Sequence, residues 1–192
     1  IRQVYAGYPT FHHSNMDEYL FAGLSGKLSP KFSYAFSVGY EMLFRKVASV
    51  NYDYNKPAGN LSLNWRMNSQ HNVGASYSLR HTAPNVGQLN PYNTSTDSLM
   101  VQQGNPYLLP SQSQQWKLRY SFNKRGFYIE PSLSYTSVTD AVEQVGKTDK
   151  ATGIYLSSYE NSRRYSFLMG SVNMRYNNSK WGGISLGIEN IT

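Results

Sequence analysis

The feature that most constrains this chain is a period of two in its apolar residues. Between residues 32 and 45, large apolar side chains occupy every second position, and small or polar side chains lie between them everywhere except at Leu43. Only a β-strand with two different faces has this period, because successive side chains of a strand point to opposite faces. The alternation returns at 61–67, 73–79, 116–122 and 127–135. The sequence therefore predicts an all-β protein.

Short and long connections alternate along the chain. Short segments rich in turn-forming residues lie at 29–31, 68–71, 123–126 and 177–180. They predict hairpins that pair 18–28 with 32–46, 58–67 with 72–83, 113–122 with 127–138, and 163–176 with 181–190. Longer polar stretches near 47–57, 83–112 and 139–162 join these hairpins. This order predicts an antiparallel up-and-down sheet of about eight strands, with short turns at one rim and long loops at the other.

The composition favours a β-sheet that lies in a membrane over a water-soluble one. The chain contains 17 tyrosines and only 15% charged residues, against about 25% charged residues in typical globular domains. It lacks an apolar run of the roughly 20 residues that a transmembrane helix needs. Strands of a transmembrane β-barrel, by contrast, face lipid on one side only. We therefore expect a transmembrane β-barrel wall with short periplasmic turns and long extracellular loops.

Aromatic residues lie where the two edges of a membrane are expected. Those close to a short turn predict a periplasmic girdle: Phe32, Trp65, Phe122, Phe127, Tyr176 and Trp181. Others further along the strands predict the opposite belt: Tyr40, Phe44, Trp116 and Tyr135. A soluble β-sandwich stays open as an alternative, although sandwich strands average about six residues. A change of the apolar face near 167–168 predicts a β-bulge there.

The polar faces of the predicted strands carry many of the basic residues. Counting by twos from the apolar positions places these on the face away from lipid, together with Glu41 and Glu130: Arg45, Arg66, Arg80, Lys117, Arg119, Arg164 and Arg175. The candidate contacts to a substrate or to an internal plug are Arg66, Arg80, Lys117, Arg119 and Arg164. An electropositive lumen favours anionic solutes or an acidic internal partner. Alternatively, these side chains only pair with carboxylates of a plug or of neighbouring strands.

The chain shows no pattern typical of catalysis or metal binding. It has no cysteine, no nucleotide-binding or hydrolase fingerprint, and only four histidines, whose spacing does not predict a metal site. The net charge of +7 is spread thinly along the sequence, so nucleic acid is not an expected partner. We expect a protein that is not an enzyme, with no catalytic residue, metal or cofactor.

A loop between two predicted strands carries a recognisable series of motifs. Arg-His-Thr-Ala-Pro at 80–84 is followed by Leu-Asn-Pro at 89–91 and by Gly-Asn-Pro-Tyr-Leu-Leu-Pro at 104–110, and the chain ends in Gly-Ile-Glu-Asn-Ile-Thr. This series resembles the barrel of TonB-dependent outer-membrane receptors, those of Bacteroidetes in particular. The family's loop motif falls on Gly104, Asn105, Pro106 and Pro110. Ser111 departs from the pattern, because the family commonly has Glu there.

The resemblance implies a function and a set of partners. Residues 1–192 would be a single section of a larger β-barrel of about 22 strands, which agrees with a pattern that starts and stops within strands. The intact receptor would take up a scarce solute (a siderophore, a cobalamin-like cofactor or a glycan) across the bacterial outer membrane by TonB-dependent gated transport. The loops at 83–112 and 139–162 would contribute to capture of the solute.

Partners would be outer-membrane lipid, the ligand and, in the intact protein, a plug domain and TonB; no plug corresponds to these residues. The alternative is a small complete outer-membrane barrel, or the soluble sandwich, with an adhesin or structural role. In a small complete barrel, the first and last strands would pair with each other.

Overall fold

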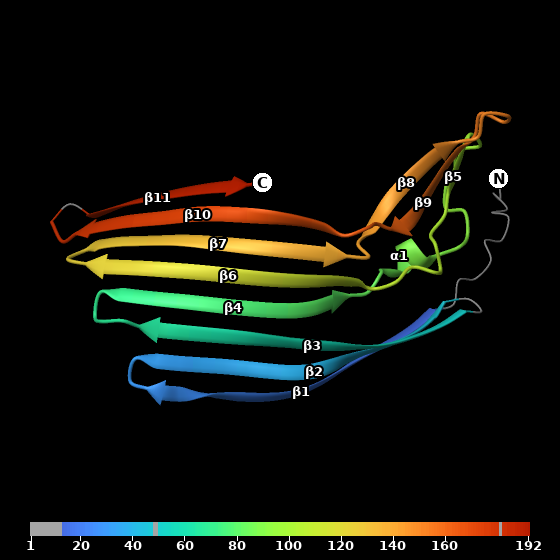
Figure 1. Ribbon diagram of the computed structural model, residues 1–192. Coiled ribbons are helices and arrows are strands. Elements are labelled where there is room, and N and C mark those ends of the chain that lie inside the picture. The colour runs from blue at the N-terminus through green and yellow to red at the C-terminus, as the bar shows by residue number, and fades with distance from the viewer. Residues whose placement is uncertain (1–12, 48–49, 181) are drawn as a thin grey trace, which may run out of the picture.

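Eight long strands form one antiparallel sheet in the computed structural model, which describes residues 13–47, 50–180 and 182–192 (Figure 1). In their order across the sheet the strands are β1 (His13–Ser29), β2 (Phe32–Val47), β3 (Val50–Arg66), β4 (His71–Thr82), β6 (Ser111–Lys124), β7 (Phe127–Thr139), β10 (Tyr165–Asn178) and β11 (Gly182–Ile191). Each strand pairs with its neighbours in antiparallel register. The predicted all-β, up-and-down architecture is confirmed.

The four predicted hairpins are present, with their short turns together at one end of the sheet (Figure 1). Local side chains build two of these turns. The Ser29 hydroxyl accepts the backbone N–H groups of Lys31 and of Phe32, the first residue of β2, at 3.2 and 3.1 Å. The Asn68 side chain accepts those of Gln70 and of His71, the first residue of β4, at 2.9 and 3.0 Å. The turn before β7 places Arg125 and Gly126 at φ values of 49° and 83°, which suits a two-residue hairpin loop.

The register gathers the large apolar side chains on one face of the sheet, which we call the outward face. Trp116 lies opposite Tyr77 on one side and Tyr135 on the other, and Tyr135 lies opposite Leu168. These side chains are not covered by protein, since Trp116 is 53% exposed. Of the predicted girdle, Phe32 pairs with Trp65, and Phe127 lies opposite Tyr176. The predicted Trp181 lies outside the described residues.

Two local predictions are wrong. The stretch near 47–57, predicted as a long loop, is mostly strand, because β2 runs to Val47 and β3 begins at Val50, directly paired with it. Its polar residues misled the prediction: pairing with β2 along its whole length holds this part of β3 as a strand although few of its side chains are apolar. The bulge predicted near 167–168 is absent, since Phe167 pairs with Thr136 and Leu168 with Tyr135 without a shift. Phe167 therefore lies on the same face as the polar side chains, which blurred the alternation in the sequence.

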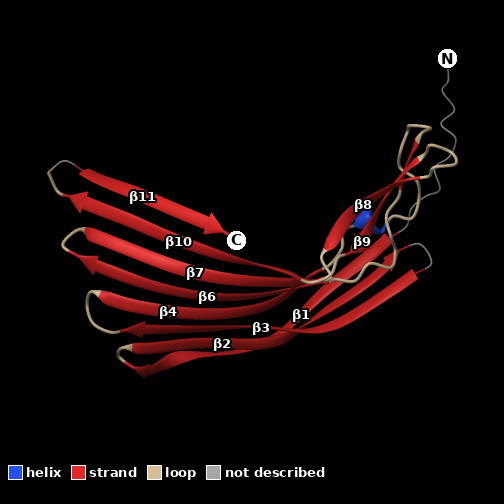
Figure 2. Cartoon of the chain, turned by 45° about the horizontal axis from the view of Figure 1, so that its top comes forward, coloured by secondary structure: helices blue, strands red, loops and turns tan. Residues whose placement is uncertain are grey.

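The sheet is open. β1 and β11 lie at its two ends and pair only with β2 and β10, respectively. A small complete barrel would need β1 to pair with β11, and a sandwich would need a second sheet over the outward face. The described residues have neither arrangement, and Figure 2 shows a single curved layer. No described helix is long and apolar enough to cross a membrane.

The two longer connections fold into a small structure beyond one end of the sheet, which we call the loop cap (residues 83–110 and 140–164; Figure 2). It contains the helix α1 (Val86–Leu89) and a three-stranded sheet in the order β5 (Met100–Gln102), β9 (Tyr155–Asn161), β8 (Val142–Thr148). Leu89 and Leu108 are fully buried there, and Tyr54 of the wall packs against them. The cap is thereby attached to the wall by its own small core.

Candidate functional site

The face opposite the outward face, which we call the inward face, carries most of the charged side chains of the eight-stranded sheet. Lys117 and Arg119 lie two residues apart on β6, opposite Ser76 and Gly74 of β4. A Cβ atom at Gly74 would lie 3.4 Å from the Arg119 guanidinium, so this glycine leaves space for the long basic side chain. Both basic residues line one hollow of about 190 Å³ with polar neighbours from β3 and β4.

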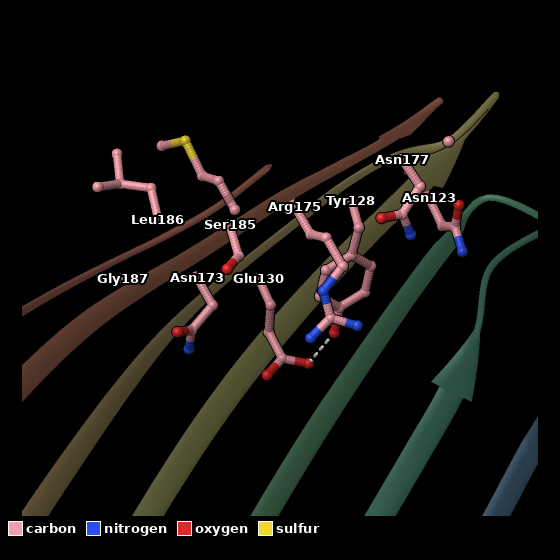
Figure 3. A pocket seen from close by; sticks show the side chains of 11 residues that line it. Asn123, Tyr128, Glu130, Asn173, Arg175, Asn177, Ser185, Leu186 and Gly187 are labelled. Atoms are coloured by element: carbon pink, nitrogen blue, oxygen red, sulfur yellow. Dashed lines mark hydrogen bonds between the residues drawn. The ribbon is translucent and has the colours of Figure 1, made fainter. Parts of the chain in front are cut away.

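A larger groove of about 620 Å³ lies on the same face near the short turns, between β7, β10 and β11. Tyr128 and Glu130 enter it from β7, Asn173 and Arg175 from β10, and Ser185 from β11 (Figure 3). Alternation places these residues there: Glu130 pairs with Asn173, and Tyr128 pairs with Arg175. The groove is therefore a product of strand register, not of a loop.

Hydrogen bonds and charge organise this groove. The Tyr128 hydroxyl donates to Glu130 at 2.5 Å (Figure 3), and Arg119 Nε lies 3.8 Å from the same carboxylate oxygen. The Arg119 side chain is 46% exposed, and pairs this open to water contribute little to stability. Arg119 and Arg175 together outnumber the single carboxylate. The groove can therefore accept a carboxylate or phosphate group, which guanidinium groups bind in a bidentate manner.

The structure places the five predicted contact residues at different distances from the short turns. Lys117 and Arg119 lie together at the middle of β6. Arg66 is the last residue of β3, beside the short turn, where its backbone N–H donates to Lys31 O at 2.7 Å. Arg80 lies opposite Ser113 near the loop cap. Arg164 precedes the first residue of β10, outside the strand in which it was predicted.

A buried ionisable cluster lies nearer the loop cap. Pairing between β3 and β4 ends at Gly59 and Leu79, which leaves the backbone N–H of His81 without a strand partner on that side. Glu41 replaces the partner: its carboxylate accepts this N–H at 2.9 Å and lies 3.1 Å from Nδ1 of the ring. Gln112 lies 3.3 Å from the other ring nitrogen. The pair is buried, with the His81 and Glu41 side chains 2% and 4% exposed.

The loop motif at 104–110 has a structural role in the cap. The backbone N–H groups of Gly104 and Asn105 donate to the carbonyl oxygens of Asn90 and Gln88, at 2.6 and 2.7 Å. A Cβ atom at Gly104 would lie 2.5 Å from the Gln88 oxygen, so only glycine fits this approach. The Asn105 side chain donates to the backbone of Tyr159 at 3.0 Å. We call these hydrogen bonds of Gly104 and Asn105 the Gly104 clamp. Pro106 follows Asn105 directly, and Pro110 is buried just before β6.

Further contacts hold the cap to the wall and to itself. The Arg45 guanidinium donates to the backbone oxygen of Pro84 and lies 3.5 Å from Asp17, while the Tyr54 hydroxyl donates to Leu108 O at 3.2 Å. Asn161 exchanges two hydrogen bonds with the backbone of Leu109, at 2.7 and 2.9 Å. The segment 83–110 is thus fixed over the inward side of β2 and β3.

Sequence reasoning missed some of these groups. It named Glu130, Arg119 and Arg175 but not Tyr128, which counting by twos from Glu130 would have found. The contact between Glu41 and His81 had no sequence signal, because it depends on the point at which β4 leaves β3. In the described part of the chain, His, Asp and Glu side chains form no group of three that could hold a metal ion.

Comparison with known proteins agrees with this geometry. Residues 20–191 match the Outer membrane protein beta-barrel family, and no curated protein sequence matches the chain. A double mutant of the Serratia marcescens hemophore receptor HasR, solved with its hemophore HasA and heme, aligns with a TM-score of 0.73 at 14% identity, over 93% of this chain and 34% of that one.

Two more solved structures share the fold. The FrpB iron transporter from Neisseria meningitidis (F5-1 variant) aligns with a TM-score of 0.68 at 10% identity, over 93% of this chain and 26% of that one. The siderophore receptor PirA from Pseudomonas aeruginosa aligns with a TM-score of 0.62 at 14% identity, over 94% of this chain and 43% of that one. The chain thus spans less than half the length of each of these three proteins. It is part of the wall of a bacterial outer-membrane barrel and belongs to the Outer membrane protein beta-barrel family.

Proposed function

We propose that this chain is a section of the wall of a receptor that takes up a scarce solute by TonB-dependent gated transport. The observation that carries the proposal is the open sheet with an apolar outward face and a charged inward face. An eight-stranded barrel has an interior filled by its own side chains, whereas an open sheet that continues into further strands leaves its inward face available to other groups. Residues 1–192 would then be one section of a larger barrel.

The structures of similar fold support a role in uptake. These structures are of a hemophore receptor, an iron transporter and a siderophore receptor. The solute of this chain would be a siderophore, a cobalamin-like cofactor or a glycan, and the excess of basic side chains on the inward face favours an anionic one. The Bacteroidetes type of receptor stays a prediction. Binding and gating, without catalysis, would be the mechanism.

The basic residues of the inward face would contact either the solute or a plug domain. Lys117 and Arg119 are the best placed of the five, because they line one hollow and Arg119 also reaches Glu130. Arg66 and Arg80 would act at the two ends of the lumen, and Arg164 would act beside the loop cap. The loop cap would form part of the entrance for the solute, since it lies at the end opposite the short turns (Figure 1).

Uptake in living cells tests this proposal. Cells that lack the full-length protein should lose uptake of one labelled ferric siderophore, cobalamin or glycan, and an uncoupler of the proton gradient should abolish the same uptake in wild-type cells. The double substitution K117Q/R119Q should lower uptake or its apparent affinity. Loss of one charge-assisted hydrogen bond of about 1.5–3 kcal/mol corresponds to roughly 10- to 150-fold in affinity.

The substitution R125Q is the matched control, because Arg125 lies in an exposed turn outside the lumen. Equal uptake by K117Q/R119Q and wild type would argue against a role for these two residues. Uptake that is insensitive to both gene deletion and uncoupler would refute the transport function.

A further inference from the structure

The ladder between β3 and β4 stops part of the way along the two strands. They pair from the short turn only as far as Gly59 of β3. Beyond this point β3 continues in its ladder with β2, and β4 continues in its ladder with β6. Two more residues of regular pairing would have placed Pro57 opposite His81. We call this unpaired stretch the seam; it lies between residues 50–58 of β3 and 80–82 of β4.

A proline at the seam explains why the ladder stops there. The N–H of Arg66 donates to Lys31 O on the β2 side, and the register of β3 with β2 continues from there without a shift. The backbone groups of successive strand residues point to alternate neighbours, so the nitrogen of Pro57, an odd number of residues away, faces β4. Proline has no N–H that could donate to His81. The N–H of His81 itself donates to Glu41, so both positions are satisfied without joining the strands.

The first three strands extend beyond the start of the seam as a three-stranded unit, which we call the finger. It consists of residues 13–21 of β1, 39–47 of β2 and 50–58 of β3, and continuous ladders hold these strands to one another. The finger runs beside the loop cap (Figure 2). Between the described residues, no hydrogen bond from one backbone group to another joins the finger to β4 or to the cap. Side chains alone make that connection.

The side chains that cross the seam form a regular series, which we call the latch. They lie on the inward face of the finger at successive steps of two residues: Glu41, Tyr54 (opposite Leu43) and Arg45. Their partners, in the same order, are the N–H of His81 at 2.9 Å, the carbonyl oxygen of Leu108 at 3.2 Å and the carbonyl oxygen of Pro84. Asp17, which also belongs to the finger, lies 3.5 Å from the Arg45 guanidinium. The latch therefore holds the finger to β4 at one point and to the loop cap at two.

The latch can open while every strand of the finger stays paired. Regions held by few contacts open locally at a lower free energy than the ladders of a sheet, and here three side chains replace a ladder. We propose that the finger is a movable flap, which separates from the loop cap as one piece about the point where β3 leaves β4. In the intact receptor this movement would widen the entrance that the cap narrows, a consequence that rests on the proposed transport function.

The distance between two spin labels on the full-length protein tests the proposal. One label is attached through N51C near the tip of the finger, and the other through T96C in the loop cap; both positions are exposed. Pulsed electron spin resonance gives the distance between them. Hydrogen exchange of residues 40–47, read by mass spectrometry, reports in the same proteins whether the finger stays paired. Heat-dependent migration in gel electrophoresis verifies that each protein is folded.

Two triple substitutions are compared in this background. E41A/R45A/Y54A removes the latch. M42A/F44A/N55A is the matched control, because these three side chains belong to the same finger but lie on its outward face. The segment from Gly59 to Asn51 is about 26 Å long at about 3.3 Å per residue, so a turn of about 10–20° displaces the tip by roughly 5–9 Å.

The variant without the latch should show a mean label distance longer by roughly 5–9 Å than wild type, with exchange of 40–47 as slow as in wild type. The control should match wild type in both measurements. An unchanged distance in the latch variant would overturn the proposal. Faster exchange of 40–47 would also overturn it, because the finger would then unfold instead of moving as one piece. Neither measurement involves a solute, so a failure of the transport function would be seen separately, in the uptake assay.

The role of Pro57 has its own test. In E41A the N–H of His81 loses its acceptor, so peptides that contain His81 should exchange faster than in wild type. In E41A/P57V, valine supplies an N–H that faces β4, and the ladder can continue to His81. These peptides should then exchange more slowly than in E41A. Equal exchange in E41A and E41A/P57V would overturn the assignment of the seam to the proline.

Discussion

Replacement of Gly104 by alanine should loosen the loop cap without affecting the wall. The new Cβ atom would lie 2.5, 2.6 and 2.7 Å from backbone atoms of Gln88 and Asn90, and no side chain can move to relieve these contacts. The segments must separate, which breaks the hydrogen bonds of 2.6 and 2.7 Å from the Gly104 and Asn105 N–H groups. At about 0.5–1.5 kcal/mol per hydrogen bond, the loss is about 1–3 kcal/mol. Local opening should therefore become roughly 5- to 150-fold more frequent.

Hydrogen exchange of the full-length protein, read by mass spectrometry, measures this effect. Peptides from 85–110 should exchange faster in G104A by that factor, while peptides from β6 and β7 should be unchanged. The control is G87A, in the helix α1, where the nearest atom to an added Cβ is an Asn85 side-chain oxygen at 3.4 Å. It should exchange as slowly as wild type or more slowly, because alanine favours a helix over glycine. Unchanged exchange in G104A would refute the claim that the hydrogen bonds of Gly104 and Asn105 hold this segment closed.

Other parts of the structure allow three more predictions. E41A should lower the heat-modification midpoint of the full-length barrel more than E41Q, because the alanine leaves the buried backbone N–H and the ring Nδ1 of His81 without their partner at a cost of about 1–3 kcal/mol; equal midpoints would contradict the proposed pairing. The pKa of Asp149, lowered by hydrogen bonds from the N–H and hydroxyl groups that follow it, should fall below its ordinary value in an NMR titration, so its contribution to turn stability should be present at neutral pH and be lost as the pH falls through that pKa. In cells, S76C should react with a water-soluble thiol reagent and A75C only with a lipid-soluble one, since the two positions face opposite sides; the same reactivity at both would be inconsistent with the assigned faces.

The wall could be predicted because one face of its strands must be apolar and the other polar. Where that contrast weakens, the prediction failed: the first half of β3 has few apolar side chains, so its strand depends on pairing with β2. Phe167 misled the prediction in another way. It is a large aromatic residue on the inward face, so the sequence around it looked like a shift of the strand register. Strand pairing across the sheet, which no local pattern records, decides both.

The candidate site was predictable to the same extent. Arg119 and Glu130 were placed on one face by counting, but their mutual approach requires the register of β6 with β7. The core of the loop cap was missed because two leucines nineteen positions apart, Leu89 and Leu108, carry no periodic signal. Loops of this kind become predictable only when the contacts of their motif, here the Gly104 clamp, are known.

The folded loop cap has a consequence for how the wall assembles. Strands joined by short turns, such as β1 and β2, need little chain entropy to meet, whereas β4 and β6 are neighbours separated by the whole segment 83–110. The entropy lost on closing a flexible loop grows with its length, and contacts between distant residues slow folding. Hydrogen bonds within the segment, from Gly104 and Asn105 to Asn90 and Gln88, reduce the effective length of this loop. The cap thus shortens the effective distance between hairpins and favours their addition to the sheet in sequence order.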